Sequence, residues 1–424
     1  MKAVVLAAGR GGRLKPFTLT RPKHLLPVGG APLLEWMLRR LGDAGVDEVL
    51  VVTHYMEEAI KDRFGAGSEL GLKISYTRQE EMLGTADAFA VAERFVDGED
   101  FIGVYGDLYL SLEAIKAVVD AHEKGETMLT VVPFDKAHLY GVVELKDDMV
   151  IRIVEKPPAG MMSSNLANAG IYYFTPEIFR WIRETKPSER QEYEITDSLR
   201  MMIESGSSVR AVTISQGDWL DVGLPWNLLD VNERALTLIE PAVEGEVEEG
   251  AHVSGDVRIC KGARIRSGAY IEGPAIIGED SDIGPNCYIR PSTSIGSGVR
   301  IGNACEVKNS IVMDGTHIAH LSYVGDSIIG ENCNLGAGTI TANIRFDERH
   351  ISVNIKGERI DSGRRKLGAL IGDDVQTGIN VSLMPGVKIG PGAWIAPGMT
   401  LYDDVSADTF ISSPTIKLKR ESLR

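Results

Sequence analysis

The first half of the chain alternates short apolar runs with segments of helical periodicity. Four apolar runs, at residues 3–8, 49–53, 101–105 and 129–132, have the length of buried strands. An example of the helical pattern is Leu33, Leu34, Met37, Leu38 and Leu41, which fall on one helical face. Strands that alternate with helices predict an α/β domain with a mostly parallel sheet covered on both faces.

A change of period marks the second half. One more amphipathic helix, with Leu228, Val231, Ala235 and Leu238 on its apolar face, is predicted to end near Pro241. Beyond it, large apolar residues recur every six positions: Val247, Val253, Ile259, Ile265, Ile271, Ile277, Ile283, Ile289, Ile295, Ile301, Val307 and Met313. Small residues follow most of them by four positions: Ala263, Ala269, Ala275, Ser281, Cys287, Thr293, Val299 and Cys305. Large and small residues that alternate inward predict a narrow parallel β-helix of hexapeptide repeats.

An interruption breaks this repeat once. The register slips by one residue between Val324 and Ile329, stops at an irregular stretch at about 341–370, and resumes at Ile371 with Thr377 as its one polar position. The insertion is rich in cations: Arg345, Arg349, Lys356, Arg359, Arg364, Arg365 and Lys366. Insertions into repeat arrays often lie on the working face. The stretch is therefore either an anion-binding flap or a solvated surface loop.

Length and charge bound the remaining possibilities. A chain of 424 residues exceeds a single core and suits two domains. We predict an α/β domain at 1–235, a linker at 236–245, a β-helix at 246–405 with an insertion at about 342–369, and a tail at 406–424. A net charge of −15 argues against a protein that coats nucleic acid, so small substrates are expected.

The location of the protein is predicted from its termini and cysteines. The first ten residues run into glycines and are interpreted as a buried strand, not as a signal peptide, and no stretch has the length of a membrane span. The four cysteines lack CxxC spacing. We expect a cytoplasmic protein in which Cys287 and Cys305, at the small inward positions, belong to the core.

A glycine-rich turn directly follows the first predicted strand. Its backbone amides are free to bind phosphate, with Arg13 as an added cation, and the predicted nucleotide-binding residues are Leu6, Ala8, Gly9, Gly11 and Gly12. A dinucleotide-binding turn has a different spacing and a later acidic residue, whereas here Pro22-Lys23 follows. This combination resembles the signature of the sugar-1-phosphate nucleotidylyltransferase family, except that Gly12 stands where the family usually has Ser or Thr.

The resemblance extends over nearly the whole chain. The first 235 residues resemble that family, which implies a Rossmann-like fold, and the hexapeptide region resembles the left-handed β-helix acyltransferases. The combined order is similar to the bifunctional N-acetylglucosamine-1-phosphate uridylyltransferase and glucosamine-1-phosphate acetyltransferase family, particularly its archaeal members. The resemblance implies Mg²⁺, UTP or dTTP, a sugar 1-phosphate and acetyl-CoA as ligands, and a homotrimer or a dimer of trimers.

The family motifs assign residues to the nucleotidyl transfer site. Lys23 and Arg13 would bind phosphates and compensate charge as the sugar phosphate attacks. Asp107, at the end of a predicted strand, and Asp221 would bind the metal, although either aspartate is also an ordinary cap or turn residue. By resemblance, the base would be bound by Gln79, Gly84 and Thr85, and the sugar by Gly141, Glu155, Lys156 and Asn168. Each of these is individually ordinary, and their order along the chain carries the interpretation.

A second set of motif residues lies in the hexapeptide region. His320 is the predicted base that takes the proton from an amino sugar, with Tyr323 beside it. Further residues match the acetyltransferase motif: Asn334, Gly336, Ala337 and Asn343. Arg290 and Lys308 lie eighteen residues apart, one coil if three hexapeptides make a turn. Stacked cations need an anion between them, which is either a sugar phosphate or Glu306. Arg349 stands where bacterial members carry lysine, which leaves the amino-sugar preference open.

Three functions remain at this point. The favoured one is synthesis of UDP-N-acetylglucosamine by acetyl and uridylyl transfer. The second is a glucose-1-phosphate thymidylyl- or uridylyltransferase whose β-helix is structural. The third is a non-catalytic assembly subunit, which the presence of Arg13, Lys23 and Asp107 argues against.

Overall fold

The computed structural model describes residues 1–158 and 160–413. These residues form two compact units. The first consists of Met1–Gly11, Arg21–Leu26 and Pro32–Gly223, and the second of Gly12–Thr20, Pro27–Ala31 and the described chain from Leu224 onward.

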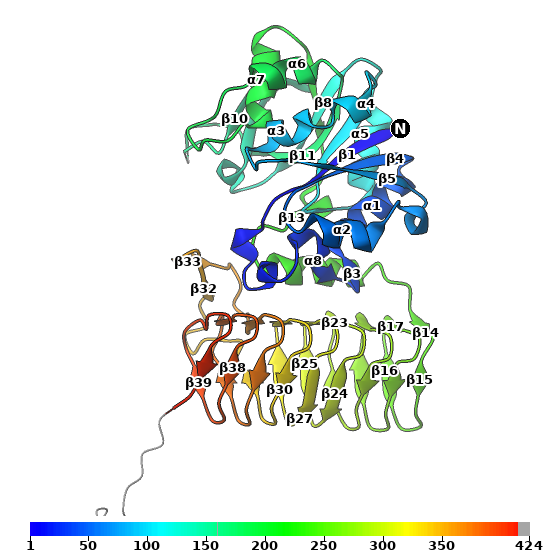
Figure 1. Ribbon diagram of the computed structural model, residues 1–424, viewed down its shortest axis with the longest axis vertical. Helices are drawn as coiled ribbons and strands as arrows, with labels where there is room; N and C mark the ends of the chain where they lie inside the picture. Colours follow the sequence, from blue (N-terminus) through cyan, green and yellow to red (C-terminus); the bar gives the residue numbers. More distant parts are fainter. Residues whose placement is uncertain (159, 414–424) are drawn as a thin grey trace, which may run out of the picture. The chain divides into compact units, whose positions relative to one another are not determined.

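The first unit is built on a sheet of nine strands (Figure 1). In spatial order they are β5 (Lys73–Arg78), β4 (Glu48–Thr53), β1 (Lys2–Ala7), β6 (Phe101–Tyr105), β11 (Leu166–Phe174), β8 (Thr127–Pro133), β12 (Val209–Thr213), β10 (Met149–Glu155) and β9 (Gly141–Lys146). The first four are parallel, as predicted, whereas β11 is antiparallel to both β6 and β8. Two short pairs complete the strands outside the β-helix and its insertion: β7 (Leu108–Leu110) with β13 (Trp219–Asp221), and β2 (Pro27–Val28) with β3 (Ala31–Pro32).

Helices bury both faces of this sheet. The α-helices of this unit are α1 (Leu33–Asp43), α2 (Glu57–Phe64), α3 (Thr85–Ala90), α4 (Glu93–Val96), α5 (Leu112–Ala121), α6 (Ile178–Glu184) and α7 (Ile195–Glu204), and α8 (Asn227–Leu236) follows them in the chain. In β1, Val5 packs with α1, α2 and α5 in one core cluster, and Leu6 packs with α3, α6 and α7 in another. Alternate residues of a central strand therefore meet apolar helix surfaces on opposite sides. The predicted apolar face of residues 33–41 is confirmed, because all five of its residues are buried.

Helix α8 groups with the second unit, unlike the sequence-based boundary at 235. Its Asn232 is fully buried, and Asn232 Oδ1 accepts hydrogen bonds from Gly29 N at 2.8 Å and Ser294 Oγ at 2.6 Å. The predicted inclusion of Leu238 was wrong: the helix ends at Leu236, and Leu238 is 61% exposed.

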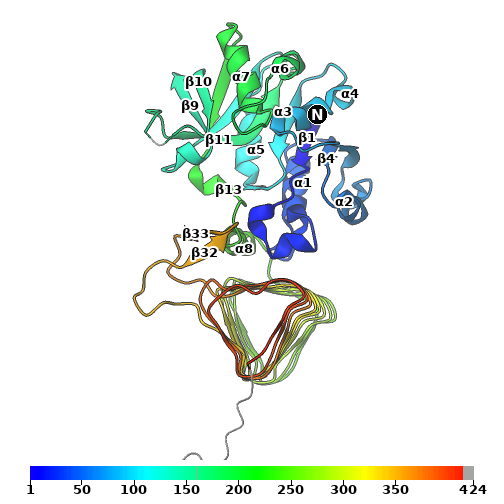
Figure 2. The same cartoon turned by 60° about the vertical axis from the view of Figure 1, so that its left-hand side comes forward.

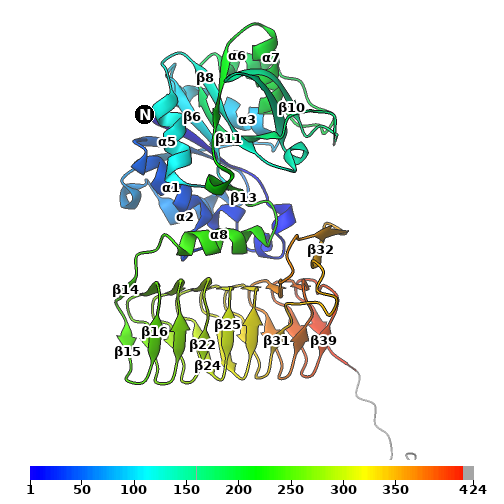
Figure 3. The same ribbon diagram turned by 180° about the vertical axis from the view of Figure 1, so that it is seen from behind.

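The rest of the second unit is a parallel β-helix of triangular cross-section (Figure 2). One face holds β14 (Ala242–Val243), β17 (Val257–Ile259), β20 (Ala275–Ile277), β23 (Thr293–Ile295), β26 (Ile311–Val312), β29 (Ile328–Ile329), β34 (Leu370–Ile371) and β37 (Lys388–Ile389). The second holds β15 (Glu246–Val247), β18 (Arg264–Ile265), β21 (Asp282–Ile283), β24 (Arg300–Asn303), β27 (His317–His320), β30 (Asn334–Leu335), β35 (Gln376–Thr377), β38 (Trp394–Ile395) and β40 (Phe410–Ile411). The third holds β16 (His252–Ser254), β19 (Tyr270–Glu272), β22 (Tyr288–Ile289), β25 (Glu306–Lys308), β28 (Tyr323–Gly325), β31 (Ile340–Thr341), β36 (Ser382–Leu383) and β39 (Thr400–Leu401), whose successive rungs are visible in Figure 3.

The six-residue period is confirmed with one correction. Ile295 pairs with Val312, so Val312 occupies the inward column that the sequence assigned to Met313. The coil from Ile295 to Val312 therefore has 17 residues, one fewer than three hexapeptides. This shift of register comes in addition to the predicted one before Ile329. Thr377 is tolerated in the core because its hydroxyl pairs with Thr339 Oγ1 at 2.8 Å and accepts from Gly336 N at 2.9 Å. Cys287 and Cys305 are both core residues, as expected.

The two ends of the repeat depart from the predicted boundaries. β40 continues the ladder by pairing with β38 beyond residue 405. The remainder of the predicted tail, 414–424, lies outside the described residues. At the other end, β14 already pairs with β17, so the ladder begins within the predicted linker 236–245. Val247, predicted to point inward, is 38% exposed.

The insertion contains a hairpin where the sequence indicated only irregular chain. Strands β32 (Ser352–Ile355) and β33 (Glu358–Asp361) pair antiparallel across Lys356 and Gly357, whose φ angles are 53° and 92°. Two successive residues with positive φ suit the twist of a two-residue hairpin turn. Val353 is fully buried, so the hairpin has a packed side.

The inward column makes a stability prediction. Replacing the fully buried Ile301 with Ala should lower the free energy of unfolding by about 2–5 kcal/mol, because the coil cannot close over the lost methyl groups. The neighbouring Arg300→Ala, at an exposed position of the same strand, is the control. Chemical denaturation followed by circular dichroism measures both, and equal midpoints would contradict the assigned packing.

Candidate active sites

The first candidate site lies where β1 and β6 end side by side. Leu6 pairs with Tyr105, and Gly106 N donates to Leu6 O at 2.9 Å, so the glycine-rich turn and Asp107 leave the same edge of the sheet. Lys23 Nζ forms an ion pair with Asp107 Oδ2. A Cβ on Gly9 would lie 3.3 Å from Lys23 Nζ, so the turn, Lys23 and Asp107 form one cluster.

The turn itself has the conformation that its glycines permit. Gly11 has a φ of 63°, in the left-handed region that favours glycine. Leu6, in β1, and Ala8, directly after it, are buried, so the chain is anchored in the core where the turn begins. Arg13 lies exposed in the 3₁₀ turn Gly12–Leu14.

Charge compensation keeps the Asp107 carboxylate ionised. Burial acts to raise the pKa of Asp107, but the charge of Lys23 and its hydrogen bond outweigh burial and hold the pKa below its ordinary value. The adjacent His24 is fully buried, and burial, with the charge of Lys23, lowers its pKa to about 3. A buried His24 with this lowered pKa adds no positive charge to the site near neutral pH.

The second predicted metal residue reaches the same edge through a short strand pair. Asp221 in β13 pairs with Leu108 in β7, and Val222 N donates to Asp107 O at 3.1 Å. Tyr140 Oη donates to Asp221 Oδ2 at 3.1 Å. Two neighbouring carboxylates fit Mg²⁺, which commonly binds one or two carboxylates together with substrate phosphates. No cluster of three or more His, Cys, Asp and Glu side chains suited to a metal occurs within residues 1–158 and 160–413.

The residues predicted to bind the base are brought together. Gln79 is buried, and Gln79 Nε2 donates to Gly84 O at 3.1 Å and Asp87 Oδ2 at 2.7 Å. Gly84, with a φ of 123°, has no room for a side chain, because a Cβ would lie 2.5 Å from Tyr193 O. Thr85 Oγ1 accepts from Ile195 N at 2.9 Å. These bonds fix the start of α3 beside β5.

The residues predicted to bind the sugar also converge. A Cβ on Gly141 would lie 3.0 Å from Glu155 Oε2 and 3.3 Å from Asn168 Cβ. Asn168 Nδ2 donates to Tyr172 Oη at 2.6 Å, and that hydroxyl lies 2.9 Å from Tyr105 Oη. Burial raises the pKa of Glu155. The group combines a carboxylate and an amide, both suited to sugar hydroxyls.

Lys156 and Arg190 lie beside Glu155, and Arg190 was not predicted from the sequence. Lys156 Nζ lies 3.7 Å and the Arg190 guanidinium 3.6 Å from Glu155 Oε1. All three line a cavity of about 550 Å³. No local spacing linked Arg190 to this site, because the contact joins segments that are distant in sequence.

The stacked cations of the β-helix each have a carboxylate partner. Ile289 pairs with Val307, so Arg290 and Lys308 follow each other on neighbouring rungs as predicted. Arg290 binds Glu306 at 2.8 Å, which agrees with the ion-pair alternative, and Lys308 binds Asp326 at 3.0 Å. The phosphate-binding role of the two cations stays a prediction.

The predicted acetyltransferase residues lie on two stacked coils, which contain β27 and β28 and then β30 and β31. Tyr323 Oη accepts from Asn343 Nδ2 at 3.1 Å, and burial raises the pKa of Tyr323. The exposed His320 ends β27, and its carbonyl accepts from Gly338 N at 3.3 Å, which places the segment that follows Ala337 beside it. Asn334, in β30, pairs with His317 in β27, at the other end of that strand from His320. In the insertion, Arg345, Arg364 and Arg365 pair with Asp347, Asp230 and Glu348.

Comparisons with known proteins agree with this division into two sites. The nucleotidyl transferase family model matches residues 2–237, and the GMPPB C-terminal domain model matches residues 271–361. The chain is 41% identical over 412 residues to the bifunctional protein GlmU of Methanococcus maripaludis strain S2, covering 97% of each chain. It is 41% identical over 417 residues to the bifunctional sugar-1-phosphate nucleotidylyltransferase/acetyltransferase of Sulfurisphaera tokodaii, covering 97% of this chain and 99% of the relative. The chain belongs to the family of bifunctional sugar-1-phosphate nucleotidylyltransferase/acetyltransferases.

The family, enzyme class and fold predicted from the sequence are thereby confirmed. A solved structure of a UDP-glucose pyrophosphorylase complexed with UDP-glucose matches with a TM-score of 0.50 and 25% identity, covering 56% of this chain and 98% of that one. The described chain has no helix with the length and apolar character of a membrane span. The roles of individual site residues remain predictions.

The close packing at Gly141 makes a prediction for this enzyme. Gly141→Ala should raise the KM for the sugar 1-phosphate about tenfold, because the new methyl group would displace Glu155. Steady-state pyrophosphate release at varied sugar phosphate measures the effect.

A matched control is Gly42→Ala in α1, where a Cβ would make an ordinary 3.4 Å contact with Leu72 Cδ2. An unchanged KM in Gly141→Ala would remove Glu155 from the sugar site.

Proposed function

We propose that the chain makes UDP-N-acetylglucosamine in two steps. In the first, the amine of glucosamine 1-phosphate attacks the thioester carbon of acetyl-CoA, the new C–N bond replaces the C–S bond, and the CoA thiol leaves. In the second, a phosphate oxygen of N-acetylglucosamine 1-phosphate attacks the α-phosphorus of UTP, and pyrophosphate leaves. The observation that carries the proposal is that one chain, alignable over nearly its full length with bifunctional relatives, holds both motif sets as two separate clusters.

In the nucleotidyl transfer site, the chain's own groups supply position and positive charge. The amides of Gly9 and Gly11 and the Lys23 ammonium would bind the phosphates, while Glu155 and Asn168 orient the sugar. Asp107 and Asp221 would hold Mg²⁺, which when bound neutralises charge on the triphosphate. Lys23 pairs with Asp107 in the structure, so its ammonium already lies at the strand edge where the phosphates and the metal would bind.

In the acetyltransferase site, His320 would take the proton from the amino group. Its exposed position leaves the imidazole accessible to substrate. Arg290 and Lys308 would bind the substrate phosphate, and the backbone at Gly336 and Ala337 would donate to the oxygen that gains charge. Asn334 and Asn343 would add contacts to the acetyl group or amine. By family resemblance, we propose a homotrimer or a dimer of trimers in the cytoplasm, where the four unpaired cysteines would stay reduced.

The alternative is a glucose-1-phosphate thymidylyltransferase with a structural β-helix. The chain is 36% identical over 269 residues to a glucose-1-phosphate thymidylyltransferase of Streptomyces griseus, covering 63% of this chain and 75% of the relative. A panel of sugar 1-phosphates with UTP or dTTP, assayed for pyrophosphate and for free CoA thiol, separates the two functions. Thiol release with glucosamine 1-phosphate supports the proposal, and nucleotidyl transfer to glucose 1-phosphate without any acetyl transfer contradicts it.

Removal of the Lys23 ammonium tests the first site. Lys23→Ala should lower kcat for nucleotidyl transfer by about 10²–10³-fold, because a fixed charge aimed at the reacting phosphate is lost. Acetyl transfer by the same variant serves as the internal control and should be unchanged. Full nucleotidyl transfer in Lys23→Ala would show that another residue is the phosphate ligand.

Removal of the His320 imidazole tests the second site. His320→Ala should lower acetyl transfer to glucosamine 1-phosphate by about 10²–10⁴-fold, which is the contribution of a general base. Pyrophosphate release should persist. His317→Ala, at an exposed position of the same strand, is the matched control, and equal losses in both variants would argue against a base at His320.

A further inference from the structure

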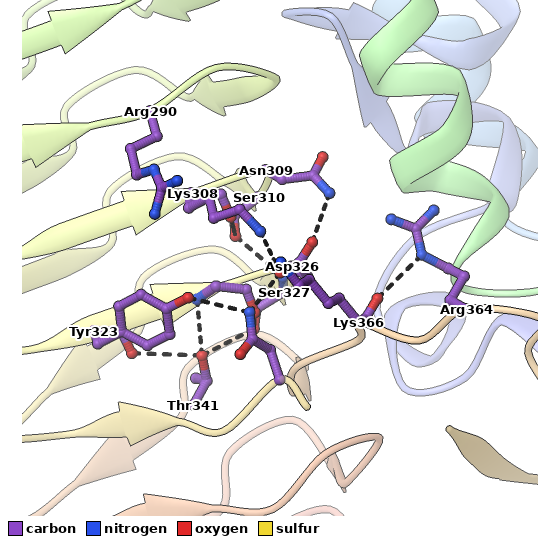
Figure 4. A network of polar contacts seen from close by, with 12 residues as sticks. Arg290, Lys308, Asn309, Ser310, Tyr323, Asp326, Ser327, Thr341, Arg364 and Lys366 are labelled. Atoms are coloured by element: carbon purple, nitrogen blue, oxygen red, sulfur yellow. Dashed lines mark hydrogen bonds and ion pairs between the residues drawn. The ribbon is translucent and has the colours of Figure 1, made fainter. Parts of the chain in front are cut away.

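One carboxylate in the β-helix has three side-chain donors. Asp326 is 2% exposed, directly after β28. Its Oδ2 accepts from Lys308 Nζ at 3.0 Å and Asn343 Nδ2 at 2.5 Å, and its Oδ1 accepts from Asn309 Nδ2 at 2.7 Å (Figure 4). The donors come from two segments, residues 308–309 of the preceding coil and Asn343 at the start of the insertion, and all three converge on this one side chain.

The backbone fixes the place of this carboxylate from two sides. Asp326 N donates to Lys308 O at 2.9 Å, and Asp326 O accepts from Gly368 N at 2.8 Å. Asp326 has a φ of 48°, a left-handed conformation at the corner of the coil. The preceding coil and the end of the insertion thus hold the residue, so the carboxylate has little freedom to follow its partners.

Two of its three partners are candidate substrate ligands. Lys308 carries a flexible stem, and ordering it on substrate binding costs conformational entropy. The bond to Asp326 orders the ammonium before substrate arrives. Asn343 Nδ2 also lies 3.1 Å from Tyr323 Oη, so the same carboxylate fixes the amide that fixes the tyrosine hydroxyl.

The free energy of folding alone does not explain why a buried carboxylate stands here. A buried ion pair often stabilises a fold no more than apolar residues of the same size, because both charges lose their hydration. Val307 and Val324, on the neighbouring strands of this face, pair with each other in the apolar core. Preorganisation of polar groups around a ligand is the gain that an apolar replacement cannot supply.

We propose that Asp326 is a positioning residue of the acetyltransferase site, which holds Lys308 for the substrate phosphate and, through Asn343, the hydroxyl of Tyr323. The inference rests on the proposed transfer of acetyl groups to an amino sugar 1-phosphate. It assigns to Asp326 no direct contact with the reacting atoms.

The test is Asp326→Asn, which keeps the shape and removes the charge. The KM for glucosamine 1-phosphate should rise at least about tenfold, because a charge-assisted bond to Lys308 is lost, while the KM for acetyl-CoA stays within about twofold. Asp326→Glu, which restores the charge, should recover part of the lost affinity. Nucleotidyl transfer by the same variants and their circular dichroism spectra report whether the chain is folded.

Asp373→Asn is the matched control. Asp373 is also buried, at 5% exposure, and it accepts from Glu331 N at 2.8 Å and from Thr20 Oγ1 at 2.6 Å. Equal effects of Asp326→Asn and Asp373→Asn on KM, or no effect of Asp326→Asn, would overturn the proposal.

Calorimetric binding of glucosamine 1-phosphate separates this inference from the proposed function. If the parent chain binds the sugar phosphate without acetylating it, the proposed function fails, while weaker binding to Asp326→Asn still supports the positioning role. Equal binding to the parent chain and to Asp326→Asn overturns the positioning role, whatever the activity.

Discussion

The register between neighbouring strands is the constraint on which both sites depend. In the first unit, the pairing of β1 with β6 brings the turn at Gly9 beside Asp107, and the pairing of β7 with β13 adds Asp221. In the β-helix, coil stacking alone places Arg290 next to Lys308. A slip of one residue would turn these side chains to the opposite face. The chemistry is therefore set by the same hydrogen bonds that build the sheets.

The two sites share an electrostatic device. Two candidate phosphate ligands, one in each site, pair with a buried or half-buried carboxylate: Lys23 with Asp107 and Lys308 with Asp326. A carboxylate partner orders the lysine, and it also offsets the repulsion among cations gathered to meet an anion. When a phosphate arrives, the ammonium can share its hydrogens between the two oxygens.

The sequence predicted the features that repeat and missed those that depend on one contact. The six-residue period was readable because every corner of the coil needs a buried side chain. The slip before Val312 was hidden because Met313 is also apolar. The grouping of α8 with the second unit was missed because the hydrogen-bond partners of its Asn232 are distant in sequence. The motif residues Gly141, Glu155 and Asn168 converge, but Arg190 and Asp326 carry no local signal. Such contacts can be identified only from the folded structure, because they join segments that are distant in sequence.

A crystal structure of the full chain with UTP and Mg²⁺ would test the central claim most directly. We expect this structure to show the triphosphate bound at the turn Gly9–Gly11, a metal held by Asp107 and Asp221, and the Lys23 ammonium in contact with a phosphate oxygen. A nucleotide bound elsewhere, with the Lys23–Asp107 ion pair intact and no metal at either aspartate, would contradict the claim that this strand edge is the site of nucleotidyl transfer.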